Sequence, residues 1–483
     1  MGILTERSPL RLFHYFEEIC AIPHGSHDPE AISAYCVDFA KAHGLDWQRD
    51  EARNVVIRAP GTPGYEDAPT VILQAHLDMV CEKDAASRHD FLRDPLELAV
   101  EGDWLHANGT TLGADDGIGV AMLLAVLEDQ TLAHPPLEVL LTTDEEVGMG
   151  GARALDCSQL QGRRLVNLDS EEEGVLTVGC VGSMWAEFRV PVSRSVGPGT
   201  AVELTVEGLL GGHSGTEIHK GRASANQLMG RLLWRLRKAA PIRLAELEGG
   251  SRGNVITSCC RAVITAEEAS LEALRSAAEN CLADFRREYA ASDPGISLGF
   301  APREGVCLPA VPQEETDRLL LLLLHIPFGV QSMSQALPGI VETSANPGVL
   351  RLAEEELLLG VSVRSFHDSH KELALARLAS LTELAGGHFT VCSSYSAWPY
   401  RPDSPLLERM KASFRCCYGR EPVVTAIHAG LECAMFCQRM PGLDAVSLGP
   451  DIRNAHSPQE KLSLSSAQRT WDYLVEILRT LKD

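Results

Sequence analysis

Between residues 70 and 169 the sequence alternates short apolar runs with helical segments, and this alternation restricts the fold more than any other feature. The runs TVILQAH (70–76), LEVLLTT (137–143) and RLVNLD (164–169) have the length and composition of buried strands, and GADDGIGVAMLLAVLEDQ (113–130) is typical of a helix. Strands that alternate with helices predict a layered α/β sheet. Because 483 residues exceed what one core usually organises, we expect more than one domain.

A different pattern begins near Trp185. The segments AEFRVPV and TAVELTVEG alternate partly with a period of two, and long helical segments follow at 224–239 and 268–289. A proline-rich stretch at 396–405 marks a return to the first pattern, which ends in a strongly amphipathic helix. We therefore predict a mixed-sheet α/β/α domain in two parts, interrupted by an inserted α+β domain. The three segments are 1–186 and 398–483 for the first domain, and 187–397 for the insertion.

The charge balance argues against whole classes of partner. The chain has 43 Lys and Arg against 66 Asp and Glu, a formal charge of −23, which opposes binding to nucleic acid or anionic membranes through a general basic field. The N-terminal MGILTERSPL has no apolar core of signal-peptide length, and no apolar run is long enough to span a bilayer. The 14 cysteines are scattered, which favours reduced thiols. We expect a cytoplasmic protein with no nucleic-acid or membrane partner.

Side chains that can bind metals follow several of the predicted strands. The carboxyl ends of strands in an open α/β sheet form the crevice where ligands bind, so we expect these groups to converge. Imidazole and carboxylate groups suit Zn²⁺, and a carboxylate has two oxygens with which to bridge two ions. Two ions about 3.5 to 4 Å apart activate a water and polarise a carbonyl at once. The candidate residues are His76, Asp78, Asp115, Asp116, Glu145, Glu146, Asp169 and His456.

Taken alone, each candidate has a plainer interpretation. His76 belongs to an H-x-D that is common at strand ends, with about one chance in ten of marking a metal site. The Asp-Asp pair at 115–116 is typical of a helix N-cap, and the Glu-Glu pair at 145–146 of a solvated turn. Asp169 begins an acidic loop, and His456 precedes S-P-Q-E, a capping-box pattern that marks a helix start.

Together, the order and spacing of these residues resemble a known family. It is the zinc aminoacylase/carboxypeptidase clan of metallopeptidases, and within it the cytosolic Xaa-His (aminoacyl-histidine) dipeptidases. One departure is the Asp-Asp pair at 115–116, where that family commonly has Asp-Asn. The matching motifs span nearly the whole chain: QAHLDMVCEK (74–83), GTTLGADDGIG (109–119), TTDEEVGMGGA (142–152), VNLDSEEEG (166–174), GLLGGHSGTEIHKGRASAN (208–226), IHAGLEC (427–433) and NAHSPQE (454–460).

The resemblance implies a dinuclear centre with two Zn²⁺ per subunit, whose ligands Mn²⁺ and Co²⁺ also accept. Asp115 would bridge the two ions, Glu145 would be the general base, and Asp78 would orient His76. The remaining ligands would complete one site with His76 and Asp169 and the other with Glu146 and His456. The resemblance also implies that the inserted domain is a lid through which a homodimer forms.

The lid supplies four substrate-binding candidates by the same resemblance. His213, in GGHSG, would reach the substrate carbonyl oxygen, from its own subunit or from a partner's. Asn254 and Arg364 would fix the substrate backbone and its free carboxylate, with which an arginine pairs bidentately. Gly430 would allow close backbone approach. Without the resemblance, His213 and Gly430 are typical of turns, and Arg364 of a solvated or ion-paired strand residue.

The sequence therefore predicts a dinuclear zinc dipeptidase that hydrolyses unblocked dipeptides, of Xaa-His type or with broad specificity. An N-acyl-amino-acid amidohydrolase on the same scaffold is the alternative, since only the pocket for the amine or acyl group differs. A non-catalytic metal-binding or assembly protein would lack a ligand or the base, and neither is missing. A serine hydrolase is disfavoured because GGHSGT does not complete G-x-S-x-G. Asp144 has no assigned role.

Overall fold

The computed structural model of the protein describes residues 2–197, 199–303 and 308–482, and it divides into two compact units. We call them unit 1 and unit 2. Unit 1 consists of Met1–Cys180, Trp398–Ala426 and Leu431–Asp483, and unit 2 of Val181–Ala397 and Ile427–Gly430. The chain thus leaves unit 1 for a long insertion and later returns to unit 2 for one short segment.

Unit 1 is built on a mixed sheet in the order β1-β2-β6-β3-β7-β23-β8-β22. The central strands β6, β3, β7 and β23 run parallel. Strands β3 and β6 are buried along their whole length, which explains their uninterrupted apolar sequences. The strands are β1 (Asp46–Arg49), β2 (Val55–Ala59), β3 (Val71–His76), β6 (Leu137–Thr142), β7 (Arg164–Asn167), β8 (Val175–Cys180), β22 (Val423–Ile427) and β23 (Asp444–Ser447).

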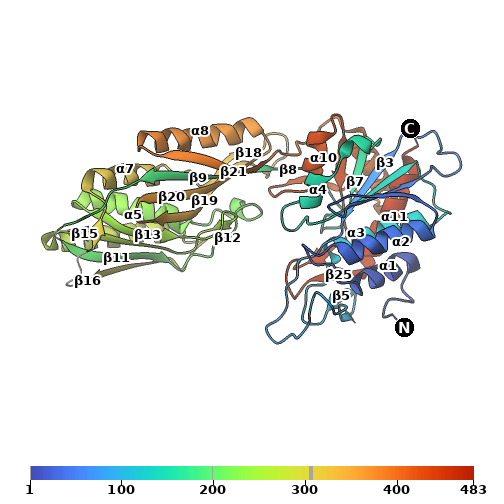
Figure 1. Cartoon of the computed structure of the whole chain (residues 1–483), viewed down its shortest axis with the longest axis horizontal. Coiled ribbons are helices and arrows are strands. Elements are labelled where there is room, and N and C mark those ends of the chain that lie inside the picture. Colours follow the sequence, from blue (N-terminus) through green and yellow to red (C-terminus); the bar gives the residue numbers. More distant parts are fainter. Residues whose placement is uncertain (1, 198, 304–307, 483) are drawn as a thin grey trace. The chain divides into compact units, whose positions relative to one another are not determined.

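Helices pack beside this sheet, α3 against β3 and α2 against β1 and β2 (Figure 1). Helix α3 is buried nearly all round, as its Ala- and Leu-rich sequence requires. A small sheet in the order β24-β25-β5-β4 completes the unit. The helices are α1 (Leu10–Cys20), α2 (Glu30–Ala42), α3 (Ala114–Glu128), α4 (Gly150–Ala154), the 3₁₀ helix η1 (Cys157–Gln159), α9 (Pro405–Tyr418), α10 (Cys433–Arg439) and α11 (Leu464–Thr480). The small strands are β4 (Leu98–Glu101), β5 (Trp104–Ala107), β24 (Ile452–Arg453) and β25 (Lys461–Ser463).

Unit 2 is an antiparallel sheet in the order β16-β11-β15-β13-β19-β20-β9-β21, with β18 paired to β19. Its strands are β9 (Gly182–Pro191), β11 (Thr200–Glu207), β13 (Arg243–Gly249), β15 (Cys260–Ala266), β16 (Ser297–Arg303), β18 (Gly329–Met333), β19 (Val341–Leu352), β20 (Glu356–Ser365) and β21 (His388–Tyr395). Two short pairs are added: β10 (Ser195–Val196) with β17 (Pro309–Ala310), and β12 (Gly212–His213) with β14 (Val255–Ile256).

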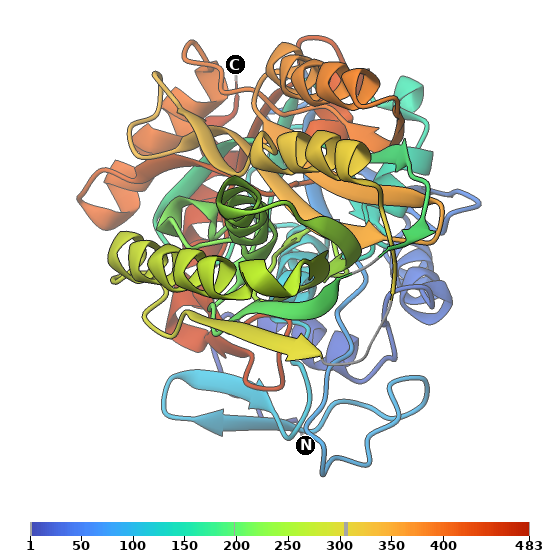
Figure 2. The same cartoon turned by 90° about the vertical axis from the view of Figure 1, so that its left-hand side faces the viewer.

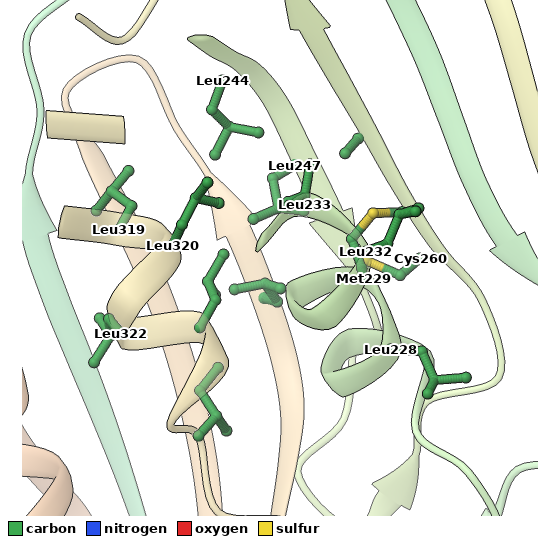
Figure 3. Close-up of a cluster of buried hydrophobic side chains, with 14 of the residues drawn as sticks. Leu228, Met229, Leu232, Leu233, Leu244, Leu247, Cys260, Leu319, Leu320 and Leu322 are labelled. Carbon is green, nitrogen blue, oxygen red and sulfur yellow. The ribbon is translucent and has the colours of Figure 1, made fainter. Parts of the chain in front are cut away.

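The helices of unit 2 are coloured from green through yellow to orange in Figure 2. They are the 3₁₀ helices η2 (Ile218–Lys220) and η3 (Glu268–Ser270), with α5 (Ala225–Ala239), α6 (Leu271–Glu288), α7 (Gln313–Leu324) and α8 (Asp368–Leu384). Helix α5 lies at the centre of the core, where its Leu228 and Leu232 are fully buried (Figure 3). Leu247 of β13 and Leu320 of α7 belong to the same cluster. Burying each such leucine stabilises the fold by about 1.5 to 3 kcal/mol.

Two further expectations from the sequence concern the state of the cysteines and membrane-spanning helices. The described cysteines are all free thiols. Among the described residues, no helix combines the length and apolar character that crossing a membrane requires.

Candidate active site

The predicted metal-binding side chains of unit 1 meet at one edge of its sheet. His76 is the last residue of β3, Glu146 follows β6, and Asp169 follows β7, so the parallel strands bring them together. Asp115 lies in the first turn of α3, and His456 lies in the loop between β24 and β25. We refer to these five residues as the metal-ligand cluster.

The Asp115 carboxylate lies between the two histidines. Its Oδ1 is 3.1 Å from His76 Nε2, and its Oδ2 is 3.1 Å from His456 Nε2. Each histidine also faces a second carboxylate: Asp169 Oδ1 is 3.5 Å from His76 Nε2, and Glu146 Oε1 is 3.0 Å from His456 Nε2. The cluster therefore consists of two halves that share one carboxylate.

Two buried oxygens of the cluster have no hydrogen-bond partner within the described part of the chain. They are Asp169 Oδ2 and Glu146 Oε1, whose contact with His456 lacks hydrogen-bond geometry. Ligand atoms of His76, Asp115 and Glu146 all lie within 4.8 Å of one another, as do those of His76, Asp116 and Asp169. Buried carboxylate oxygens that accept no hydrogen bond from a described residue, next to imidazole nitrogens, form a set of ligand atoms that fits divalent cations such as Zn²⁺.

The pKa shifts of the cluster also favour bound cations. Burial raises the pKa of Asp169 to about 7, and burial together with the charge of Asp169 raises the pKa of Glu145 well above its usual value. The hydrogen bond to Asp115 and the nearby Glu146 raise the pKa of His456 to about 11. Although burial opposes it, the two histidines lower the pKa of Asp115. The carboxylates thus outnumber the cationic groups, and bound cations would remove the imbalance.

Asp116 occupies the position where the resembling family has asparagine. Its Oδ2 accepts a hydrogen bond from the His76 N–H at 3.2 Å, and burial raises its pKa well above the usual value. A protonated carboxyl has the planar shape of an amide, so the aspartate side chain fits a position that asparagine can also occupy. Gly119 provides the room, since a Cβ there would lie 2.2 Å from Asp116 Oδ1.

The solvated interpretations of this edge are wrong. The side chain of Glu146 is 6% exposed and that of Asp169 is 9% exposed, so neither lies in a solvated turn or loop. Both carboxylates are directed into the protein, where only a cation or a proton can neutralise them.

The capping interpretations are also wrong, for one shared reason. The Glu460 carboxylate accepts the N–H groups of Leu112, Gly113 and Ala114 at 2.7, 3.0 and 2.8 Å, and so caps α3 itself. S-P-Q-E starts no helix, because residues 457–460 form turns and the Glu460 side chain is used on α3. Glu460 therefore connects the loop of His456 with the helix of Asp115, a role that sequence reasoning missed.

Asp78 makes different contacts from those expected. His76 Nδ1 is 2.9 Å from the Asp78 backbone oxygen and 3.6 Å from its carboxylate, so the carbonyl makes the closer contact. The carboxylate instead accepts hydrogen bonds from the N–H groups of Glu145 and Glu146 and from Ser26 Oγ. Burial alone would raise the pKa of Asp78, but these donors and His76 lower it below its usual value.

A buried polar network behind the cluster was also missed. Glu432 is fully buried, and its Oε2 accepts hydrogen bonds from Gln74 Nε2 and Thr142 Oγ1, both at 2.6 Å. Gln74 Oε1 in turn accepts from Asn167 Nδ2 at 2.5 Å. The network connects β3, β6 and β7, which carry three of the ligands at their ends. Burial raises the pKa of Glu432 to about 8. The signal in the sequence was Gln74, a polar residue inside the apolar run VILQAH.

The four substrate-binding candidates lie in unit 2. Arg364 of β20 is 8% exposed, its Nε has no hydrogen-bond partner, and it forms no ion pair with any residue that the structure describes. The interpretation of Arg364 as solvated or ion-paired is therefore wrong. Burial and the charge of Arg364 lower the pKa of His213. Asn254 is exposed, with its backbone oxygen accepting from Ser214 N at 2.9 Å, and Gly430 ends the short returning segment.

Comparisons with known proteins identify relatives that match nearly the whole length of this chain. The model of peptidase family M20/M25/M40 matches residues 72–480. The chain is 37% identical over 483 residues to the cytosol non-specific dipeptidase of Escherichia coli K12, covering 100% of this chain and 99% of that one. It is also 37% identical to the aminoacylhistidine dipeptidase from Vibrio alginolyticus, whose crystal structure matches with a TM-score of 0.91 over 99% of this chain and 98% of that one. A tripeptidase from Staphylococcus aureus shares the fold, with 16% identity and a TM-score of 0.57 over 98% of each chain.

Proposed function

The chain belongs to the M20/M25/M40 peptidase family, and from that premise we propose that it is a dinuclear zinc dipeptidase acting on unblocked dipeptides. The family resemblance and the mixed α/β fold predicted from the sequence are confirmed, and the protein is a hydrolase of peptide bonds. The observation that carries the finer proposal is the Asp115 carboxylate, with one oxygen directed to each histidine of the cluster.

Two cations would be held by the two halves of the cluster. His76 and Asp169 would complete one site and Glu146 and His456 the other, with Asp115 shared. Oxygen and nitrogen donors in these numbers suit Zn²⁺, and Mn²⁺ or Co²⁺ accept them as well. When bound, the ions supply Lewis acidity that makes a water acidic and polarises a peptide carbonyl.

Glu145 is the proposed general base. It is adjacent in the chain to the proposed ligand Glu146 without belonging to the cluster, and a carboxylate in that place can accept a proton and later return it. It takes a proton from the attacking water and delivers it to the departing amine. Replacing the carboxylate therefore removes the proton transfer and leaves the five ligands in place.

His213 and Arg364 of unit 2 would bind the substrate. The Thr216 N–H donates to His213 Nδ1 at 3.1 Å, so the neutral imidazole carries its proton on Nε2, which is then the donor to the substrate carbonyl oxygen. The buried Arg364 would pair with the free carboxylate of the dipeptide. Asn254 would fix the substrate backbone, and Gly430 would allow close backbone approach.

The substrate class, location and assembly are part of the same proposal. The names of the two similar dipeptidases support broad or Xaa-His specificity, and one of them is named a cytosol enzyme, which supports a cytoplasmic location. A homodimer through unit 2 is supported by β21, an edge strand whose Phe389 and Val391 are 38% and 43% exposed.

An assay of the zinc-loaded protein decides between a dipeptidase and an N-acyl-amino-acid amidohydrolase. The panel contains Ala-His, other unblocked dipeptides, and N-acetylated amino acids. We expect hydrolysis of the dipeptides and none of the acetylated compounds. Hydrolysis of the acetylated compounds alone would overturn the proposal in favour of the amidohydrolase. Metal content measured on the same sample would show whether two ions are bound per chain.

A further inference from the structure

We propose that Ser26 is a positioning residue for Glu145, acting through the Asp78 carboxylate, and that Asp144 anchors the loop that carries Ser26. The inference rests on the proposed function, because it takes Glu145 as the general base. It assigns a purpose to two residues that lie outside the metal-ligand cluster.

The Asp78 carboxylate fixes the turn that carries the base. It is 1% exposed, and its Oδ1 accepts the Glu145 N–H at 2.9 Å. Its Oδ2 accepts the Glu146 N–H at 3.3 Å. One buried carboxylate therefore holds two consecutive peptide groups, those of the proposed base and of its neighbouring ligand. Where this carboxylate lies decides where the Glu145 backbone lies.

Ser26 supplies the third donor to that carboxylate. Ser26 Oγ lies 2.8 Å from Asp78 Oδ2 and 3.4 Å from the Met79 backbone oxygen, so its single proton goes to the carboxylate. It is the shorter of the two hydrogen bonds to Oδ2. Rotation about the last side-chain bond of aspartate is soft, so the carboxylate needs donors on both oxygens to stay in one plane. Removing the hydroxyl leaves Oδ2 with only the long bond from Glu146.

The loop that carries Ser26 is held at the ends of two strands. Beyond β3, the Met79 N–H donates to the His24 backbone oxygen at 3.1 Å, and the Ser26 N–H donates to the Met79 oxygen at 3.2 Å. Beyond β6, the His27 N–H donates to Asp144 Oδ1 at 2.6 Å. The loop therefore connects the segment of Asp78 with the segment of Glu145.

Asp144 makes this connection from an unusual backbone conformation. Its φ is 54°, in the left-handed region that aspartate, asparagine and glycine tolerate best. Its own carbonyl accepts the Gly150 N–H at 2.9 Å, which closes the turn after β6. Of the three consecutive carboxylates, Asp144 is thus the one that faces the loop and leaves the other two free for the site.

The test compares hydroxyl-keeping and hydroxyl-removing variants of the full chain loaded with zinc. We expect Ser26→Ala to lower kcat about 10- to 100-fold, because a small misplacement of a catalytic group has an effect of that size. KM for Ala-His should stay within about twofold, and the loss of kcat should persist at saturating zinc, which is checked because Asp78 also holds the N–H of the proposed ligand Glu146. Ser26→Thr should restore most of kcat. Ser33→Ala is the matched control, since Ser33 is a buried serine whose Oγ donates to the Arg53 oxygen at 2.7 Å.

Asp144 is tested by separating its side chain from its backbone. Asp144→Gly keeps the left-handed conformation and removes the acceptor of the His27 N–H, so it should lower kcat several-fold. Asp144→Asn keeps an acceptor oxygen and should stay near wild type. Equal activity of the glycine and asparagine variants would overturn the anchoring role.

A Glu145→Ala variant keeps failure of the inference distinct from failure of the proposed function. Glu145→Ala should bind zinc and lose turnover, and unchanged turnover would refute the assigned base. If Glu145→Ala is inactive while Ser26→Ala has wild-type kcat, or falls no further than Ser33→Ala, only the positioning role is overturned. Recovery of wild-type kcat by Ser26→Ala at saturating zinc would also overturn it, because Ser26 would then act only through the proposed ligand Glu146. In the Glu145→Ala background, Ser26→Ala should have no additional effect on residual turnover.

Discussion

The metal-ligand cluster of unit 1 and the surroundings of Arg364 in unit 2 are both buried and polar, but their charges are unbalanced in opposite directions. The cluster collects three carboxylates around two histidines, with buried oxygens that lack donors. In unit 2, the buried Arg364 guanidinium has no ion pair with a described residue and lies near imidazoles whose pKa values it lowers. Under the proposed function, each region would be completed by a ligand of opposite charge, a cation in unit 1 and an anion in unit 2.

The two regions also respond oppositely to pH. Burial raises the pKa of Glu432, behind the cluster, to about 8, so the folded protein retains a proton that the unfolded chain loses near its usual pKa of 4.5. Stability is therefore lost as pH rises from 4.5 through 8. In unit 2, burial and Arg364 lower the pKa of His428 to about 3. The unfolded chain binds that proton below 6.5, so stability is lost as pH falls from 6.5 toward 3.

Removing the cation should have the largest effect and would test the unit 1 side of the comparison. Treatment with a chelator should lower dipeptidase turnover by about a thousandfold, because the ions contribute several kcal/mol to the reaction. Adding back Zn²⁺, Mn²⁺ or Co²⁺ should restore it. The measurement is turnover against metal content per chain. Full activity in a sample with far less than one ion per chain would contradict the metal centre.

Removing the cationic side chain should have the next largest effect, and it tests the unit 2 side. Arg364→Met should raise KM for Ala-His roughly 30-fold or more, because truncating one partner of a buried charge pair costs about 2 to 5 kcal/mol. Wild type should also bind a dipeptide amide weakly, whereas the variant should no longer distinguish amide from acid. Arg351→Met, on the exposed side of neighbouring β19, is the control. Equal KM increases for the two variants would contradict a carboxylate site at Arg364.

Neutralising Glu432 should sharpen the pH comparison. Glu432→Gln mimics the protonated carboxyl and still accepts hydrogen bonds from Gln74 and Thr142. The metal-free variant should be closest to wild type at pH 5 and become progressively more stable than wild type up to pH 8, by up to about 1.4 kcal/mol per pH unit. Thermal unfolding midpoints across pH 5 to 9 would measure this. Parallel curves for the two proteins would show that Glu432 is ionised in the folded state.

The smallest expected effect concerns His428. Its Nδ1 donates to the Val341 oxygen at 2.9 Å, so Nε2 accepts from Ser344 Oγ at 2.7 Å. Ser344→Ala should lower stability by about 1 kcal/mol at pH 7 through the lost hydrogen bond. The acid-side loss should shrink, because the freed Nε2 accepts a proton more readily. Ser380→Ala, an exposed serine of α8, is the control, and unfolding midpoints at pH 4 and 7 are the measurement. Identical midpoints for both variants at pH 7 would count against this bond.

The fold could be predicted largely because periodicity reports burial. The runs at 70–76 and 137–143 became β3 and β6, since strands buried on both faces must be apolar throughout. The predicted helix at 224–239 is α5, whose leucines repeat at helical spacing. The return of Ile427–Gly430 to unit 2 could not be predicted, because four residues are too few to show any period.

The members of the cluster could be predicted because they follow strands that end at one edge. What could not be predicted were contacts made by backbone groups and by residues distant in sequence. Glu460 caps α3 from 345 or more residues away, and a capping-box pattern predicted a helix start there instead. Ser26 gives no signal at all, since a serine between two helices is ordinary until the Asp78 carboxylate is placed beside it.

The return of Ile427–Gly430 also bears on how this architecture can be divided or recombined. Excising 181–397 as one contiguous cassette would leave behind His428, whose ring is hydrogen-bonded to Val341 and Ser344 of that cassette. The transplanted segment would lack the imidazole, so the Ser344 hydroxyl and the Val341 carbonyl would lose their hydrogen-bond partner. Unit 2 is therefore not one contiguous module: any natural or engineered exchange of this unit has to move residues 427–430 along with residues 181–397.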